Sequence, residues 1–189
     1  MKIVFASHNQ KKAAEIRSVL PTGMSLLTLH DLELGEEIPE NEPTIEGNSA
    51  FKANWVLQRF GLPCFADDTG LEVAALNGAP GVHSARYAGT ERSDEANMNK
   101  LLAALKDSSD RSAQFKTVIT YCDATTSEQF TGVVRGLIAT EKSGTEGFGY
   151  DPIFIPEDQH KTFAQKLRAT QYLVDFYLLC GSAKALWRR

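Results

Sequence analysis

The chain has 189 residues, in which 20 lysines and arginines stand against 24 aspartates and glutamates for a formal charge of -4. This balance argues against a protein whose affinity rests on a broad basic surface for nucleic acid, although a small anionic ligand needs only a local positive pocket. Hydrophobic residues make up 42 % of the chain, which is enough for the core of a single domain over residues 1–189.

The first third of the chain predicts a strand, a tight loop and a helix, followed by a long loop and a second helix. Residues 2–6 are rich in β-formers, and apolar residues recur at helical spacing in residues 9–20. Residues 32–48 are acidic, contain two prolines and show no sustained period, so we expect a surface loop. Asn48 is the predicted cap of the second helix, which ends at Gly61 and Pro63.

The middle of the chain continues with a short strand, a turn and a third helix. Residues 64–66 are an apolar strand that runs directly into Asp67 and Asp68, and the glycines and proline of residues 77–81 allow only a turn or loop. Ser93 is the predicted cap of the third helix. The apolar face of this helix is expected to carry Met98, Leu101, Leu102 and Leu105.

The last part of the chain predicts a hairpin and a final helix. Residues 115–121 alternate in strand fashion, and a turn through residues 123–127 folds them back onto a strand over residues 130–138. Residues 167–180 have a helical pattern. Because helices and strands alternate first and a hairpin follows, the predicted fold class is mixed α/β (α+β) and not a plain parallel doubly wound sheet.

Cysteine usage and the N-terminus bear on the compartment. Cys64, Cys122 and Cys180 lack the close spacing of a zinc site or a disulfide framework, which favours reduced structural thiols. No apolar stretch at the N-terminus is long enough for a signal peptide, and no segment approaches the roughly 20 apolar residues of a membrane span. We therefore expect a cytoplasmic protein without a membrane or nucleic-acid partner.

Polar and basic residues gather where the first predicted helix begins. Ser7, Asn9, Lys11 and Lys12 lie around an end whose unpaired backbone N–H groups and positive dipole favour an anion. Side-chain donors and a lysine charge would make this a triphosphate cradle without a glycine-rich loop. Taken alone, these residues are explained more simply by a capped surface helix with solvated lysines, because helix caps are common.

Two adjacent carboxylates, Asp67 and Asp68, follow the predicted third strand and would project into the crevice where α/β sites form. Mg²⁺ takes oxygen ligands and usually only one or two carboxylates. One acid of the pair, with the acidic loop near Glu46, could hold the metal and orient a water. Solvated acids in a turn are the alternative, since structural ion pairs also involve carboxylates.

The third cluster is Gly147-Phe148-Gly149-Tyr150-Asp151-Pro152. Glycines allow a close approach of the backbone to a ligand, and an aromatic ring can cover the face of a flat base. An aromatic-glycine turn that closes a hairpin is the structural alternative.

Taken together and in this order, the clusters resemble the inosine triphosphate pyrophosphatase family, also called the Ham1 or non-canonical purine NTP pyrophosphatase family. The matching stretches are ASHNQKK at residues 6–12, TIEGNSAFKA at 44–53, FADDTGLEVAALNGAPGVHSARYAG at 65–89 and GTEGFGYDPIF at 144–154. The resemblance implies a two-lobed fold with a central mixed sheet flanked by helices, and a homodimer. It also implies Mg²⁺-dependent hydrolysis of ITP, dITP or XTP to the monophosphate and pyrophosphate.

Residue by residue, the resemblance implies that Asp68 is the general base and a magnesium ligand, supported by Asp67. Glu46 is the implied second metal-side carboxylate, although some members carry the acid one position later. Thr69 stands where the family usually has serine and keeps the hydroxyl. The residues implied in substrate binding are Ser7, His8, Asn9, Gln10, Lys11, Lys12, Lys52, Thr69, Phe148, Gly149, Tyr150 and Asp151. No histidine is assigned a catalytic part.

The chain departs from the family after Ala164, which makes residues 165–189 atypical. Members continue with a loop that carries a lysine and then a Ser-His-Arg motif, which occurs nowhere in this sequence. In the family these His and Arg side chains contribute to base recognition and to the phosphate end of the site. Lys166 or Arg168 could replace their charge, but an ammonium cannot copy a planar guanidinium fork. We predict slower turnover or poorer discrimination between inosine and guanosine triphosphates than in an orthodox member assayed beside it.

Two other functions are weighed against the pyrophosphatase. One is a catalytically impaired nucleotide-binding homologue, which would share the pocket and differ in turnover. The other is a Maf-like pyrophosphatase for modified pyrimidine nucleotides, and the cluster at residues 147–151 argues against it.

Overall fold

The computed structural model describes residues 2–165, so the predicted helix over residues 167–180 lies outside the described part. The chain divides into two compact units. Within the described residues, the first unit contains the chain up to Asp68 together with Thr117–Gly132. The second unit contains Thr69–Lys116 and the residues from Val133 onward.

Three long strands continue across the boundaries between the units: β3 (Cys64–Val73), β5 (Ser112–Cys122) and β6 (Ser127–Ile138). The strand order of the sheet is β2-β1-β3-β5-β6-β7, and β4 also pairs with β3. Parallel pairing joins β1 to β2 and to β3, whereas β4 and β7 pair antiparallel with β3 and β6. The predicted mixed α/β class and the predicted hairpin are confirmed.

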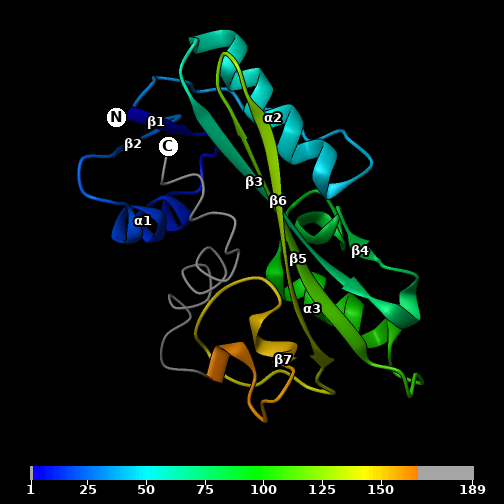
Figure 1. Ribbon diagram of the computed structural model, residues 1–189. Helices are drawn as coiled ribbons and strands as arrows, with labels where there is room; N and C mark the ends of the chain where they lie inside the picture. The colour runs from blue at the N-terminus through cyan, green and yellow to red at the C-terminus, as the bar shows by residue number, and fades with distance from the viewer. Residues whose placement is uncertain (1, 166–189) are drawn as a thin grey trace. The chain divides into compact units, whose positions relative to one another are not determined.

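The first unit begins with β1 (Lys2–Phe5), α1 (Gln10–Val19) and β2 (Ser25–Thr28), which lie beside one another in Figure 1. The predicted strand and helix are present, and Asn9 caps α1 by accepting a hydrogen bond from the Lys12 N–H at 3.1 Å. Strand β2 was not predicted from its sequence, SLLT, which is too short for a clear period.

Among the described residues of the first unit, one hydrophobic cluster lies on each face of the sheet. Val4 of β1 and Ala66 of β3 belong to the cluster that includes residues of α2 (Ile45–Phe60). Phe5 and Phe65 belong to the cluster that includes residues of α1, and their rings stack at 5.1 Å. Neighbouring residues in a strand face opposite sides, so α1 and α2 cover opposite faces.

Helix α2 begins earlier than predicted, because Thr44 and not Asn48 is its N-cap. The Thr44 hydroxyl accepts a hydrogen bond from the Gly47 N–H at 3.0 Å, whereas Asn48 lies inside the helix and is buried. Both residue types are good caps, so the sequence alone favours neither. The predicted end is correct: Gly61 adopts a left-handed conformation with φ 65°.

Strand β3 is longer than predicted. The prediction ended the strand at Ala66, but it continues through both aspartates to Val73. Its pairing with β1 ends at Phe65, and its pairing with β4 (Pro80–Gly81) involves Leu71 and Glu72. The two acids therefore lie just beyond the residues paired with β1. The predicted turn at residues 77–81 holds for Asn77–Ala79, but its last two residues pair as a short strand.

The second unit contains α3 (Asp94–Ala104) and β7 (Phe154–Pro156). Ser93 caps α3 as predicted, and the predicted apolar face is buried except for Leu102, which is partly exposed. Phe115, Phe154 and Phe163 pack together in its core. The short 3-10 helices of the unit are η1 (Ala74–Leu76), η2 (Ser84–Arg86), η3 (Asp151–Ile153) and η4 (Phe163–Gln165).

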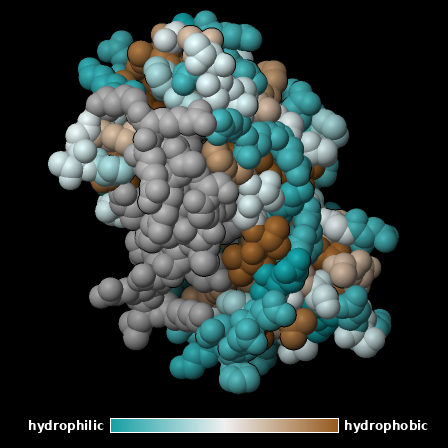
Figure 2. Space-filling view, in the orientation of Figure 1, coloured by the Kyte–Doolittle hydropathy of each residue, from teal (hydrophilic) through white to brown (hydrophobic). Residues whose placement is uncertain are grey.

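Figure 2 shows hydrophobic residues in small patches among hydrophilic ones on the face that it draws. The large hydrophobic side chains that are exposed are Phe51, Val133, Leu137 and Phe148. No helix within residues 2–165 is long and apolar enough to cross a membrane.

Candidate functional site

The loop that joins β1 to α1 presents a helix N-terminus at the end of the sheet. The Ala6 N–H donates to the Phe65 carbonyl at 2.8 Å, which places Ser7 next to the part of β3 that carries Asp67 and Asp68. The Ser7 hydroxyl accepts a hydrogen bond from the Asn9 N–H at 3.2 Å. Ser7 and the cap residue Asn9 therefore lie at the N-terminus of α1, where the positive end of the helix dipole favours an anion.

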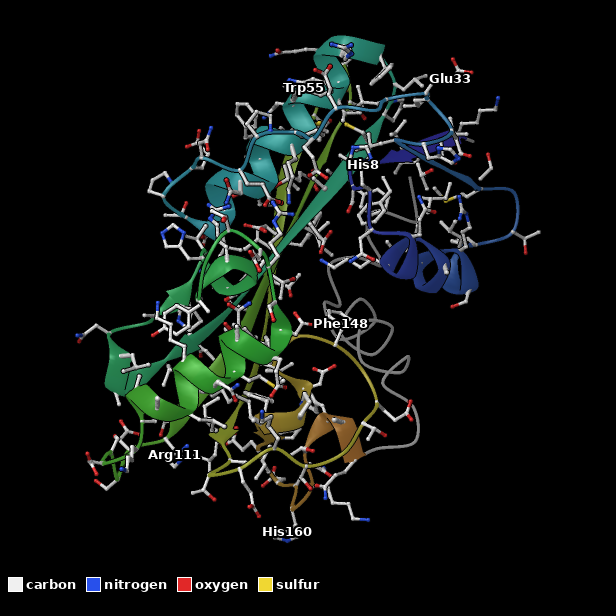
Figure 3. All side chains as sticks on the ribbon, turned by 180° about the vertical axis from the view of Figure 1, so that it is seen from behind. His8, Glu33, Trp55, Arg111, Phe148 and His160 are labelled. Carbon is white, nitrogen blue, oxygen red and sulfur yellow. The ribbon has the colours of Figure 1, made fainter. Side chains whose placement is uncertain are left out.

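The other candidate residues of this loop, His8, Gln10 and Lys11, differ in their surroundings. The ring nitrogen Nε2 of His8 lies 3.0 Å from the Glu36 carbonyl oxygen, and Figure 3 labels this side chain. Gln10 is exposed at the start of α1. Lys11 lies in the same helix, but its side chain is outside the described part of the structure.

Lys12 reaches a buried carboxylate instead of solvent. Its ammonium contacts Oδ2 of Asp67, whose side chain is only 1 % exposed. The other oxygen, Oδ1 of Asp67, is buried and has no hydrogen-bond partner within the described residues. Asp67 points to the same face of β3 as Phe65, toward α1, because the two residues are two apart in the strand.

Asp68 points to the opposite face of β3, toward α2, and lies in a cluster of charged side chains. Its side chain is 15 % exposed, and Oδ1 lies 3.6 Å from Nζ of Lys52. Lys52 also donates to Oε1 of Glu40 at 2.8 Å. Asn48 donates to Oδ2 of Asp68 at 3.2 Å. The fold of the first unit therefore brings two acids and a lysine together.

Burial and neighbouring charges shift the protonation equilibria of this cluster. Burial raises the pKa of Asp68, and the negative charges of Glu40 and Asp67 add to that effect, while Lys52 and Asn48 oppose it. Burial alone would lower the pKa of Lys52, but the charges of Asp68, Asp67 and Glu40 outweigh it, so this pKa is raised. A carboxylate with a raised pKa is a better proton acceptor in its ionised form.

The residues present fit a divalent cation of the magnesium type. Within residues 2–165 no group of three or more His, Cys, Asp or Glu side chains could hold a metal, but Mg²⁺ characteristically takes one or two carboxylates and completes its shell with water and phosphate oxygens. Asp68 and Glu40 share Lys52 and supply two such carboxylates. The unpartnered Oδ1 of Asp67 is a further oxygen close by in sequence.

Glu46 lies in the first turn of α2 and is partly exposed. Its backbone carbonyl accepts a hydrogen bond from Nε2 of Gln129 at 3.0 Å. Glu40, in the loop before α2, is a carboxylate that shares Lys52 with Asp68.

The aromatic-glycine turn belongs to the second unit and is held together by two carboxylates. Oδ2 of Asp151 accepts from the Phe148 N–H at 2.9 Å, and Oδ2 of Asp94 accepts from the Gly149 N–H at 2.8 Å. Gly147 has φ 83°, and a Cβ there would lie 2.1 Å from Oδ2 of Asp151, so only glycine fits. Burial raises the pKa of Asp151 to about 6, and Asp94 contributes to the shift.

The two aromatic residues of this turn differ in availability. Tyr150 is buried, and its hydroxyl donates to the Ser84 carbonyl at 2.9 Å. Phe148 is 44 % exposed, and Figure 3 labels its side chain. Only Phe148 is therefore free to cover a flat ligand. Thr69, the first residue of this unit, is partly exposed within β3.

A family model described as the Ham1 family matches residues 3–171. The chain belongs to the Ham1 family. A protein from Flavobacterium johnsoniae named dITP/XTP pyrophosphatase is 56 % identical over 165 residues, which cover 87 % of this chain and 86 % of the relative. A protein of the same name from Flavobacterium psychrophilum is 50 % identical over 188 residues, which cover 94 % and 99 %.

Solved structures agree with this membership. A Ham1 protein from Coxiella burnetii has a TM-score of 0.91 at 34 % identity and covers 100 % of both chains. The Staphylococcus aureus Ham1 protein has a TM-score of 0.88 at 37 % identity, with 98 % of this chain and 99 % of the other covered. The predicted two-lobed Ham1 fold is thereby confirmed. The departure predicted after Ala164 falls almost wholly outside the described residues.

Sequence reasoning missed two residues of this candidate site, Glu40 and Asn48. Glu40 stands in an acidic loop without a period, where nothing distinguishes it from Glu36, Glu37 or Glu42. Asn48 was interpreted as a helix cap, although it lies four residues before Lys52 and therefore on the same face of α2. That spacing was the available signal, since it aligns both side chains toward one target.

Proposed function

We propose that this chain is a nucleoside triphosphate pyrophosphatase that hydrolyses non-canonical purine triphosphates such as dITP, ITP and XTP to the monophosphate and pyrophosphate. The observation that carries the proposal is the cluster of Asp68, Lys52 and Glu40, in which two acids share one lysine. Membership of the Ham1 family and the two flavobacterial relatives named dITP/XTP pyrophosphatase support the substrate class.

The chain's own residues can perform the reaction by positioning and proton transfer. The first turn of α1 and the Ser7 hydroxyl bind the phosphate chain. Asp68 accepts a proton from a water molecule, and the oxygen of that water attacks the α-phosphorus. The bond from the α-phosphorus to the bridging oxygen then breaks. Pyrophosphate leaves with the bridging oxygen. Lys52 beside Asp68 adds positive charge where negative charge accumulates.

We also propose that Asp68 and Glu40 hold a Mg²⁺ ion. When bound, the ion supplies positive charge that offsets the charge developing on the phosphate oxygens. The support is the pair of carboxylates around Lys52 and the orphaned oxygen of Asp67. Glu46 stays a candidate from the family resemblance alone.

The turn at residues 147–151 is the proposed base-binding element, with the exposed Phe148 ring stacked on the purine. Support comes from the hydrogen bonds by which Asp151 and Asp94 fix the backbone of this turn, and from the family resemblance. From the same resemblance we propose a homodimer, and from the free thiols of Cys64 and Cys122 a reducing, cytoplasmic location.

The experiment follows pyrophosphate release from dITP, XTP, ITP, ATP and GTP, with Mg²⁺ and with a chelator. We expect release from the first three, little from ATP, and loss of activity on chelation. Release of inorganic phosphate in place of pyrophosphate would overturn the site of attack. Undiminished activity in chelator would overturn the metal.

A further inference from the structure

Asn48 lies between two parts of the charged cluster that are distant in sequence. It belongs to α2, its side chain is buried, and the residue as a whole is 1 % exposed. Its amide oxygen accepts a hydrogen bond from the Glu42 N–H at 3.0 Å, and its amide nitrogen donates to Oδ2 of Asp68 at 3.2 Å. One side chain thus joins the acidic loop to strand β3.

The two bonds fix the orientation of the amide. A backbone N–H can only donate, so the amide oxygen must face Glu42. The NH₂ group then has to face Asp68, where an ionised carboxylate can only accept. Neither bond can form with the amide rotated, and the side chain is therefore held at both ends.

Lys52 repeats this connection one turn later on the same face of α2. Its ammonium lies 2.8 Å from Oε1 of Glu40 and 3.6 Å from Oδ1 of Asp68. The loop segment that carries Glu40 and Glu42 is therefore attached to Asp68 twice, once through a neutral amide and once through an ammonium. The contacts of Lys52 are ion pairs, whereas the contacts of Asn48 are directional hydrogen bonds of a neutral amide.

We propose that Asn48 is a positioning residue for the divalent-cation site. It holds the loop of Glu40 and the carboxylate of Asp68 at a fixed separation, so that both acids can bind one cation. The inference rests on the proposed function for the presence of the cation, and it goes further in assigning a role to a residue that does not touch the substrate.

The test replaces Asn48 and measures Mn²⁺ binding directly, by electron paramagnetic resonance of the free ion, at a temperature well below the melting point. We expect Asn48→Ala to bind Mn²⁺ about tenfold more weakly, the lower end of what loss of a residue that orients metal ligands costs. Asn54→Ala is the matched control: Asn54 is exposed on the same helix, and its amide donates to the Ala50 carbonyl at 2.9 Å.

A merely structural role predicts a different result. It would lower the melting temperature of Asn48→Ala without moving the Mn²⁺ affinity of the folded fraction. Affinity within about twofold of the wild type, or no binding of Mn²⁺ by the wild type, would overturn the proposal. Asn48→Ser, whose hydroxyl is too short to reach both partners, provides the same comparison should the alanine variant not fold.

Two further results keep this proposal separate from the proposed function. If the wild type releases no pyrophosphate, the proposed function is wrong. The Mn²⁺ affinities of the wild type and Asn48→Ala can still be compared in that case. Glu40→Gln combined with Asn48→Ala should weaken Mn²⁺ binding by less than the product of the single effects, because both act on the same pair of carboxylates. Full additivity would contradict a positioning role.

Discussion

Asp67 and Asp68 are neighbours in sequence but face opposite sides of β3, and this alternation separates their roles. Asp67 faces α1 and holds Lys12, whereas Asp68 faces α2 and meets Lys52 and Asn48. Each carboxylate therefore has its own cation, and the repulsion expected for paired acids is reduced. Asp68, the more exposed of the two, is the one available to a water.

The role of Asp68 can be tested by removing its charge while keeping its shape. Asp68→Asn should retain the fold and lower the rate of pyrophosphate release from dITP at least about a hundredfold, the lower end of what a positioned base contributes. Steady-state assays at saturating Mg²⁺ measure the effect. A rate near that of the wild type would remove Asp68 from its proposed role.

The Lys12–Asp67 pair predicts a stability effect that is independent of catalysis. Lys12→Met leaves the carboxylate of Asp67 buried without its cation and should cost about 3 kcal/mol of unfolding free energy. Adding Asp67→Asn removes the buried charge, so the double variant should recover most of the loss. Urea denaturation of the wild type, Lys12→Met and the double variant measures the free energies of unfolding. If the double variant is as unstable as Lys12→Met, the buried charge of Asp67 is not the cause.

At the scale of elements, the turn at residues 147–151 depends on a glycine that no other residue can replace. In Gly147→Ala the new Cβ would meet Oδ2 of Asp151 and break its bond to the Phe148 N–H. We expect KM for dITP to rise several-fold, with a smaller change in kcat, because Phe148 would be displaced. Gly23→Ala is the control, since it also has positive φ but open space around its Cβ.

The same turn predicts a pH dependence of stability. The pKa of Asp151 is about 6 in the folded protein, against an ordinary value of 3.8. The folded state therefore holds this proton more tightly, and its stabilising contribution is complete below about pH 4 and is lost as the pH rises through 6. Denaturation of wild type and Asp151→Asn between these values should show a steeper decline in the wild type. Parallel profiles would contradict the shifted pKa.

Local signals in the sequence predicted most elements but not the contacts between them. Ser93 as the cap of α3 and Gly61 as the end of α2 follow from side-chain and backbone chemistry within a few residues. The start of α2 was wrong because Thr44 and Asn48 are both suitable caps. Glu40 could not be found, since its meeting with Lys52 depends on how an aperiodic loop folds back onto the helix.

At the scale of the whole molecule, the composition and family resemblance predicted class and activity type, while the assembly stays a proposal. If the chain forms the proposed homodimer, light scattering coupled to size-exclusion chromatography should give twice the chain mass of 20.8 kDa. The value should not change on dilution through the micromolar range. A mass of one chain would exclude a stable dimer.

The two described thiols have a practical consequence for measuring how the first unit opens. Cys64 and Cys122 are both buried, and their sulfur atoms lie 3.3 Å apart within the core cluster of that unit. A maleimide cannot reach either sulfur until β3 and the end of β5 separate from α2, so alkylation at these positions reports that event. With Cys180 changed to serine, the rate at which maleimide modifies Cys64 and Cys122, measured by mass spectrometry, would report how often the first unit opens.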